Sequence, residues 1–359
     1  MAEPRITAAI TGHRGELARR ERAAVGQMAH AFAGITNRMA GEIAALEDEL
    51  AAIIDAGERP TIGRIYRMQR YRSLLAQAAA EFDRYGQDVG AILGPLTRDA
   101  VGQATRDAGE LTRLVLGPPP PGITADVLFT KLPTDAIADI VATTRSGPLA
   151  ELFGQFGAMA AHDARTALIY GIALGEHPNR VARRIRDSLG TSLSRATTIA
   201  RTEQLRAYRE GHRRWYDENS RVIKGYVWHS ALGRNTCVAC WAMHGTEFDT
   251  KEPMGTHPNC RCAMVPVTKT WRELGFNVSP ANESSVNIER GPVLFGRLKP
   301  SEQLHILGPK AFAAYRAGDI AISDLIHKHR SADWGLTRSR GSLKRALASA
   351  QRRGGDATA

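Results

Sequence analysis

The chain has 359 residues, a formal net charge of +11 and a pI near 9.8, and it is 43% hydrophobic but only 6% aromatic. This length admits two or three domains, and the Ala-rich, aromatic-poor composition favours packed helices over a β-sandwich. No run approaches the about 18 uninterrupted apolar residues of a membrane span, and the first residues lack the apolar segment of a signal peptide. The basic charge predicts a polyanionic neighbour.

The N-terminal region, 1–116, is predicted to be a helical hairpin or bundle. Its first helix runs from about Gly15 to Ala56 and is broken by Asp55-Ala-Gly-Glu-Arg-Pro60, after which Thr61 caps a second helix. Gly90 and Gly94-Pro95 are expected to interrupt the chain before a further helical stretch at 96–116. The stripe of the first helix repeats every three or four residues and comprises Met28, Phe32, Ile35, Met39, Ile43, Leu46, Leu50 and Ile53.

Gly117-Pro-Pro-Pro-Pro-Gly122 cannot be helical and is predicted to be a linker. A second helical region is expected over 123–220. Its candidate helices cover 134–140, 149–162, 163–174 and 179–186, the last capped by Asn179. A longer helix is predicted to begin at Thr191 or Ser192 and to end at Asp217.

Arg201 and Glu203 form part of a distinctive segment of that long helix. Glu203 shares a face with apolar residues, and an acid on such a face must be paired. Because Arg201 is too close in sequence to face it, we expect the partner to be Arg195, Arg206 or a residue of another element. A structural ion pair that clamps helix to sheet is favoured over acid–base catalysis, since one carboxylate without a partner acid makes no mechanism.

The hydrophobic period changes at Arg221, where a small β module over 221–267 is predicted. Its expected strands lie at 222–229, 247–249 and 262–267, with Pro266 marking an edge. A sheet of this size requires a staple to be stable.

All four cysteines of the chain lie in this module, as Cys237-Val-Ala-Cys240 and His257-Pro-Asn-Cys260-Arg-Cys262. A C-x-x-C turn directs two thiolates at one centre, and tetrahedral Zn²⁺ takes two further N or S ligands from a second turn. Cys237, Cys240 and Cys260 are common to most ligand sets, and the fourth ligand is His257 or Cys262. His244 is a weaker candidate beside Gly245.

Two disulfides, for example Cys237 to Cys262 and Cys240 to Cys260, are the alternative, but disulfides require an oxidising compartment. No H-E-x-x-H or deaminase-type signature is present, which argues against a catalytic zinc. The cluster is therefore predicted to be a structural zinc site.

The chain beyond the module is expected to comprise an extended linker at 268–300 and a basic helical region at 301–359. Ser301 is predicted to cap a helix ending near Ala317, and Ser323 another through Arg330. Residues 291–359 hold twelve Lys and Arg against five Asp and Glu, whereas 225–267 is neutral. Contacts to DNA phosphates are therefore assigned to the C-terminal region, through Arg338, Arg340, Lys344, Arg345, Arg352 and Arg353.

Several motifs in fixed order resemble the minor head, or head-morphogenesis, proteins of tailed bacteriophages, of the Mu F-like kind. They are Ala200-Arg-Thr-Glu203, a strand with Trp228, Thr236-Cys-x-x-Cys240, Gly245 and His257-Pro-Asn-Cys260-Arg-Cys262. The similarity covers residues 165–267. The C-terminal segments Ile306-Leu-Gly308 and Tyr315-Arg-Ala-Gly318 are also similar to the tails of such proteins.

The resemblance implies a non-enzymatic virion protein present in a few copies inside the procapsid, near the portal vertex, and in the host cytoplasm during assembly. It implies a part in assembly and in DNA packaging or delivery, with portal, capsid or scaffold proteins and double-stranded DNA as partners. The sequence thus predicts a mainly α fold with a small α+β module stapled by zinc or cysteines.

Two other functions are open. A metal-dependent nuclease of the finger type would use His229, His244 and His257 around a zinc-stapled unit. A DNA-binding regulator would use the cysteine module as a finger, but the module is neutral and no recognition helix is predicted.

Overall fold

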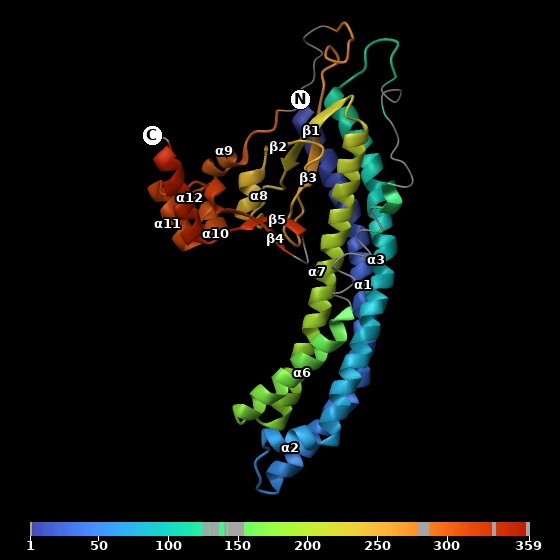
Figure 1. Cartoon of the computed structure of the whole chain (residues 1–359), viewed down its shortest axis with the longest axis vertical. Helices are drawn as coiled ribbons and strands as arrows, with labels where there is room; N and C mark the ends of the chain where they lie inside the picture. The colour runs from blue at the N-terminus through green and yellow to red at the C-terminus, as the bar shows by residue number, and fades with distance from the viewer. Residues whose placement is uncertain are drawn as a thin grey trace. The chain divides into compact units, whose positions relative to one another are not determined.

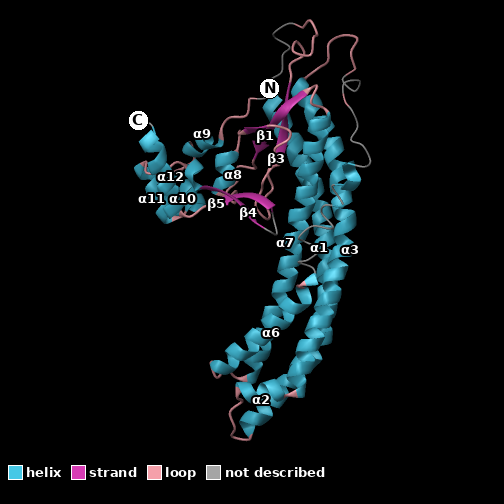
Figure 2. Ribbon diagram, viewed as in Figure 1, coloured by secondary structure: helices cyan, strands magenta, loops and turns pink. Residues whose placement is uncertain are grey.

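A computed structural model describes residues 2–124, 129, 136–139, 142, 154–278, 287–331 and 335–356. The described chain is mainly helical, with small antiparallel sheets, as the sequence predicted (Figures 1 and 2). None of the described helices combines the length and the apolarity that crossing a membrane requires.

The N-terminal helices are longer than the sequence predicted. α1 covers Ala2–Asp55, α2 covers Ile62–Arg67 and α3 covers Gln69–Leu116. Thr61 caps α2 as expected, because its side chain accepts a hydrogen bond from the Arg64 amide. Met68, with an extended backbone, then separates α2 from α3.

The predicted breaks at Gly90 and Gly94-Pro95 are wrong, because α3 continues through both. Leu93 and Leu96 are buried on either side of the proline. The Thr97 hydroxyl donates to the carbonyl oxygens of Leu93 and Gly94, 2.9 and 3.0 Å away. Packing and this local hydrogen bond offset the loss of one backbone donor at the proline.

The second helical region comprises α6, Phe156–Ala173, and α7, Pro178–Glu218. The sequence predicted one helix that begins at the Asn179 cap and ends at Arg186, and another that begins at Thr191 or Ser192. Instead α7 begins at Pro178 and runs through all of these residues, including Gly190. Leu189 and Ser192 are both buried. Tertiary packing therefore outweighs the local preference of glycine for a helix end. Two of the predicted helices, 134–140 and 149–162, lie partly outside the described residues. The parts concerned are 134–135, 140 and 149–153.

The β module has the three predicted strands, β1 Ile223–His229, β2 Glu247–Phe248 and β3 Ala263–Thr268. They form an antiparallel sheet in the order β2-β1-β3, in which Tyr226 pairs with Phe248 and Trp228 with Met264. Between β1 and β2 lies a short helix that the sequence did not predict, α8, Val238–Met243.

The C-terminal region differs most from the prediction. α9, Gly291–Gly296, falls in the expected linker, and the helix expected from Ser301 is two helices, α10 Pro300–Leu307 and α11 Pro309–Ala317. Gly308 separates them with φ of 71°, which ends α10, and Gly318 ends α11 as predicted.

The predicted helix from Ser323 to Arg330 is wrong. A 3₁₀ turn, η3 Ile322–Leu325, leads instead into β4, Ile326–Ser331, which pairs with β5, Gly335–Arg340. The alternation His327-Lys-His-Arg330 has the period of a strand rather than of a helix. The chain then forms α12, Leu343–Asp356.

The chain divides into two compact units, and the long helices contribute residues to both. One unit comprises 1–18, 98–141 and 205–359, and the other comprises 19–97 and 142–204. In the second unit, Phe82, Tyr85 and Phe156 are buried and their rings are in contact, with Tyr85 stacked on Phe156. This unit also contains the paired side chains Arg38 and Glu81.

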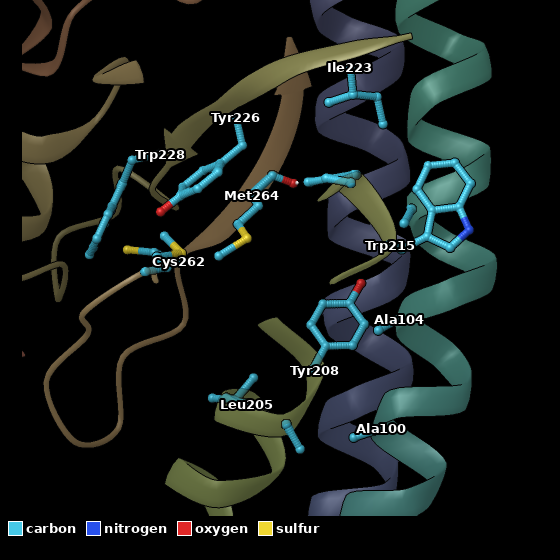
Figure 3. Close-up of a cluster of buried hydrophobic side chains, with 14 of the residues drawn as sticks. Ala100, Ala104, Leu205, Tyr208, Trp215, Ile223, Tyr226, Trp228, Cys262 and Met264 are labelled. Carbon is cyan, nitrogen blue, oxygen red and sulfur yellow. Dashed lines mark hydrogen bonds between the residues drawn. The ribbon is translucent and has the colours of Figure 1, made fainter. Parts of the chain in front are cut away.

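The first unit contains the β module, whose sheet packs on the ends of α3 and α7 (Figure 3). Trp215 and Tyr216 of α7 share one hydrophobic cluster with Tyr226 and Trp228 of β1. The Trp271 indole nitrogen donates to the carbonyl oxygen of Leu116, 2.9 Å away, at the end of α3. The sheet is therefore anchored by helices as well as by its cysteine cluster.

α7 approaches α3 closely in this unit because residue 211 is glycine. A Cβ atom at Gly211 would lie 2.7 Å from the Ala104 Cβ atom, closer than packed carbons approach. The close approach places Tyr208 and Arg209 of α7 beside the side chains described below.

Candidate metal centre

Two short segments deliver the cysteines to one place. Cys237 precedes α8 as its N-cap, and Cys240 lies in the first turn of that helix, so both sulfurs point to the same side. The second segment is a turn in which the Cys260 amide donates to the His257 carbonyl oxygen. Asn259 adopts φ of 61° there, a left-handed conformation that Asn tolerates better than most residues.

The donor atoms lie at the spacing of a tetrahedral ion. The His257 Nε2 atom is 3.2 Å from each of the Cys237 and Cys240 sulfurs, and the Cys240 and Cys260 sulfurs are 3.7 Å apart. Zinc bonds of about 2.3 Å to sulfur and about 2.0 Å to nitrogen would place two sulfurs about 3.8 Å apart and sulfur and nitrogen about 3.5 Å apart. The cluster could therefore hold a metal ion with little rearrangement.

The ring of His257 is already oriented for ligation. Its Nδ1 atom lies 2.8 Å from the Pro258 carbonyl oxygen, so Nδ1–H donates there and Nε2 faces the sulfurs. Such a hydrogen bond on the second ring nitrogen is the usual support of a metal-binding histidine.

Cys262 holds a different position from the other three cysteines. Its sulfur lies within 4.8 Å of those of Cys240 and Cys260, in a group of three that does not contain His257. Cys260, by contrast, also forms a hydrogen bond with the His257 ring. The Ser230 hydroxyl, which donates to the Cys240 carbonyl oxygen, is 3.2 Å from the Cys262 sulfur. The geometry therefore favours His257 over Cys262 as the fourth ligand.

His244, the weaker candidate, lies outside both groups of donors. It is buried, and its Nδ1 atom accepts a hydrogen bond from the Ser230 amide, 3.0 Å away. Its ring also contacts that of His229. It thus connects the end of β1 with the chain after α8.

The four cysteines are free, and the alternative of two disulfides is not formed. Hydrogen bonding with the Cys240 sulfur lowers the pKa of the Cys237 thiol to about 5, and bonds with Cys240 and Cys262 hold the pKa of Cys260 well below its ordinary value. Burial raises the pKa of Cys262 to about 12. Two thiolates are thus available at neutral pH, the form that binds metal.

His257 carries a proton in the metal-free cluster. Burial acts to lower its pKa, but hydrogen bonds with the sulfurs of Cys237 and Cys260 outweigh burial and raise the pKa to about 10. A metal ion would displace this proton, so binding releases protons and weakens in acid.

A buried arginine that the sequence analysis did not single out holds the second turn in place. The Nε atom of Arg209, on α7, donates to the Cys262 carbonyl oxygen, 2.9 Å away. A second guanidinium nitrogen donates to the Cys260 carbonyl oxygen. A third nitrogen donates to the Thr256 hydroxyl. Arg209 lies about 50 residues before these acceptors, and no local pattern in the sequence marks such an interaction.

A second arginine, Arg14 of α1, reaches the same module. It donates to the His229 carbonyl oxygen, 3.1 Å away, and its charge acts on Cys260 and Cys262. Burial lowers the pKa of Arg14. Two cations near the thiolates stabilise their negative charge, which a single metal ion would only partly neutralise.

Arg201 and Glu203 are both on α7, in the second compact unit. Arg201 forms an ion pair with Glu21 of α1, with Nε 2.6 Å from Oε1. This pair joins α7 to α1, and the ion pair predicted for Glu203 stays a prediction. Glu203 is 1% exposed, as its place on an apolar face predicted.

The residues predicted to contact DNA are not equivalent. Arg338 of β5 is 5% exposed and is paired with Glu252, 2.6 Å away. Its guanidinium lies over the rings of Phe248 and Trp228. Arg338 therefore links β5 to the cysteine module and is not available to a phosphate.

The other residues of that group are on or near α12. Arg340, Lys344, Arg345 and Arg352 are exposed, although Arg340 also donates to the carbonyl oxygens of Ile306 and Leu307. The side chain of Arg353 lies outside the described residues. DNA contact through this surface stays a prediction.

Part of the chain is similar to a known protein family. No curated protein and no solved structure matches the chain. Residues 162–265 match the model of the family described as Phage Mu protein F like protein. The match begins in α6, contains the Arg201 and Glu203 segment of α7, and ends in β3 after the last cysteine. Residues 162–265, less than a third of the chain, are therefore similar to the Phage Mu protein F like family.

Proposed function

We propose that this protein is a minor head protein of a tailed phage or prophage that acts inside the procapsid near the portal, in assembly and in DNA packaging or delivery. The observation that carries the proposal is the family match over 162–265, which includes the complete cysteine and histidine cluster. The partners are the portal protein, capsid or scaffold proteins, and double-stranded DNA.

Within this proposal the cluster is a structural zinc site with Cys237, Cys240, His257 and Cys260 as ligands. The set supplies four N and S donors, which leaves no open position for a substrate. Bound zinc would fix α8 and the turn at 257–260 against the end of β1. Its contribution is to folding, not to chemistry.

The proposed role is non-enzymatic, because the histidines that a finger nuclease would need are engaged in the fold. His229 and His244 are both buried, and burial lowers their pKa values to about 3 and about 4. The guanidinium of Arg14 also lies 3.5 Å from the His229 Nδ1 atom, and the Ser230 amide donates to the His244 Nδ1 atom. Neither ring is presented to a phosphodiester. Plasmid nicking with Mg²⁺ or Mn²⁺ tests this, and metal-dependent cleavage would contradict it.

A groove-reading finger is disfavoured for a related reason. All six residues of α8 are buried, so this helix cannot enter a DNA groove. The proposed DNA contact is instead made to phosphates, without sequence preference, by exposed basic residues of α12 and Arg340.

The experiment that tests the proposed function is assembly of particles in cells that express this protein with the neighbouring portal and capsid genes. Quantitative mass spectrometry of purified particles should find a few copies of the protein. A parallel preparation without the portal should lack it. Equal amounts with and without the portal would contradict the portal association, and absence from both would contradict the virion role.

A further inference from the structure

A second cluster of potential metal ligands lies in the first unit, apart from the cysteines. His13 comes from α1, and Asp107 and Glu110, three residues apart on one face, come from α3. Their donor atoms lie within 4.8 Å of one another. The His13 Nε2 atom is 3.0 Å from Glu110 Oε2 and 3.6 Å from Asp107 Oδ1.

The far oxygen of Asp107 is held in the way that protein ligands of metals are commonly held. The Tyr208 hydroxyl donates to Asp107 Oδ2 over 2.7 Å, and the Gln103 amide donates to the same atom over 3.0 Å. Figure 3 shows Tyr208 projecting from α7 within this unit. Both donors leave Oδ1 facing His13.

Gln103 supplies the second indication of a ligand. Its side chain is 0% exposed, and its nitrogen also donates to the His13 carbonyl oxygen, 3.2 Å away. Its oxygen, Oε1, is buried and has no hydrogen-bond partner among the described residues. A buried carbonyl oxygen without a donor is costly unless an ion or a water satisfies it.

The charges of the cluster also favour a cation. Asp107 and Glu110 place two carboxylates beside the His13 ring, and Glu16 adds negative potential at Asp107. Burial of Asp107, whose side chain is 8% exposed, makes uncompensated negative charge expensive. A divalent ion balances the charge of the two carboxylates.

We propose that His13, Asp107 and Glu110 bind one divalent transition-metal ion, of the Mn²⁺ or Zn²⁺ class, through His13 Nε2, Asp107 Oδ1 and Glu110 Oε2. Imidazole among the donors favours these ions over Mg²⁺ and Ca²⁺, which take oxygen ligands. The ion joins α1 to α3 one residue from Arg14, which binds the end of β1. It therefore fixes the turn of α1 that meets the cysteine module.

The test is a titration of the full chain, first loaded with one equivalent of zinc, with Mn²⁺. Free Mn²⁺ is followed by its electron paramagnetic resonance signal. Mn²⁺ prefers nitrogen and oxygen donors, so the thiolate centre does not compete for it. The variants are His13→Gln and Glu110→Gln, and Glu110 is exposed, so its substitution leaves the fold intact. His30→Gln, which changes an exposed histidine of the same helix, is the matched control.

The wild-type chain and His30→Gln should each bind one Mn²⁺. The affinity should fall by at least about tenfold in both His13→Gln and Glu110→Gln, since each removes a ligand. A wild-type chain that binds no more Mn²⁺ than His13→Gln would overturn the proposal. So would a Glu110→Gln variant of unchanged affinity.

Discussion

Arg209 is a buried side chain that positions the candidate metal ligands without being a ligand itself. Its guanidinium satisfies the carbonyl oxygens on either side of Arg261, in the turn that bears Cys260 and Cys262. Backbone carbonyls in a turn have no sheet partner, so a buried cation with several donors is an efficient way to satisfy them.

Replacement of Arg209 by Met, which keeps the side chain's apolar length but removes its donors, should lower the free energy of unfolding of the first unit by about 3 kcal/mol. It should also weaken metal binding by about 10- to 100-fold, as removal of a group that orients metal ligands does. Urea unfolding and competition with a chelator measure the two effects. Arg214→Met, at an exposed position of the same helix, is the control and should change neither.

The ligand set leads to a prediction that separates the four cysteines. Cys237→Ser, Cys240→Ser and Cys260→Ser should each release the metal, because each removes one of four ligands. Cys262→Ser should keep the metal. The other three cysteines each form a hydrogen bond with His257, whereas the Cys262 sulfur lies against the Ser230 hydroxyl. Metal analysis by mass spectrometry of the native protein distinguishes them. Loss of metal from Cys262→Ser with retention by His257→Ala would reverse the assignment.

His212 predicts a pH dependence of stability. Burial lowers its pKa from 6.5 to about 3. As the pH falls below about 6.5, His212 therefore takes up a proton in the unfolded chain but not in the folded chain. The contribution of His212 to the free energy of unfolding is thus fully present above pH 6.5 and is lost as the pH falls towards 3. Between pH 7 and pH 5 the loss should be about 2 kcal/mol.

Urea unfolding of the wild-type protein and His212→Gln at the two pH values measures this contribution as a difference, in which effects common to both proteins cancel. His305→Gln, at an exposed position, serves as the control and should follow the wild type. Parallel pH profiles for the wild type and His212→Gln would show that the residue titrates normally in the folded chain.

Among individual residues, the metal donors were predictable from the sequence because their chemistry is local. C-x-x-C and H-x-x-C-x-C spacing brings ligands together within one turn each. The residues that support the donors were not predictable in this way. Arg14, Arg209 and Ser230 reach the centre from α1, from α7 and from the chain after β1, and only the fold brings them together.

At the scale of elements, α12 is both a structural and a candidate binding element. Its apolar side contributes Ala346, with Leu343 and Leu347, to the hydrophobic cluster formed with α8, α10 and α11. Removal of the C-terminal residues from 338 onward would therefore disrupt the fold together with any DNA binding. Substitution of exposed charges is the informative change.

Lys344→Gln, Arg345→Gln and Arg352→Gln combined should weaken binding to duplex DNA uniformly across sequences. The slope of log affinity against log salt should fall by about one unit for each phosphate that the variant no longer neutralises. Fluorescence anisotropy at several salt concentrations measures the slope.

A control of equal charge is available on α7, where Arg180, Arg183 and Arg186 are exposed. Their combined replacement by Gln removes the same three charges and should leave the slope unchanged. An equal fall in both variants would show that binding depends on total charge rather than on α12.

The elements that the sequence predicted incorrectly share a cause. Pro95 and Gly190 are strong local breakers, yet α3 and α7 continue through them because their long apolar faces are packed on both sides. In the C-terminal region a helix was predicted where none forms. Ser323 is a plausible helix cap, but the residues after it pair as strands β4 and β5. Long periodic helices and alternating strands were predictable, whereas interruptions were decided by tertiary packing.

At the scale of the whole molecule, the two units are built from the same three long helices, so the chain does not divide at its Pro-rich linker. The matched region, 162–265, contains residues of both units, from α6 to β3. α1, α3 and α7 each contribute residues to both units, and this could not be deduced from a sequence read segment by segment.

Under the proposed function, this chain is a metal-stabilised structural component of phage particles. Counting protein copies and zinc ions in the same purified particles, by quantitative mass spectrometry and elemental analysis, tests this most directly. A few copies of the protein per particle and at least one zinc ion per copy are expected. Particles that lack the protein, or that contain it without zinc, would contradict the proposed function.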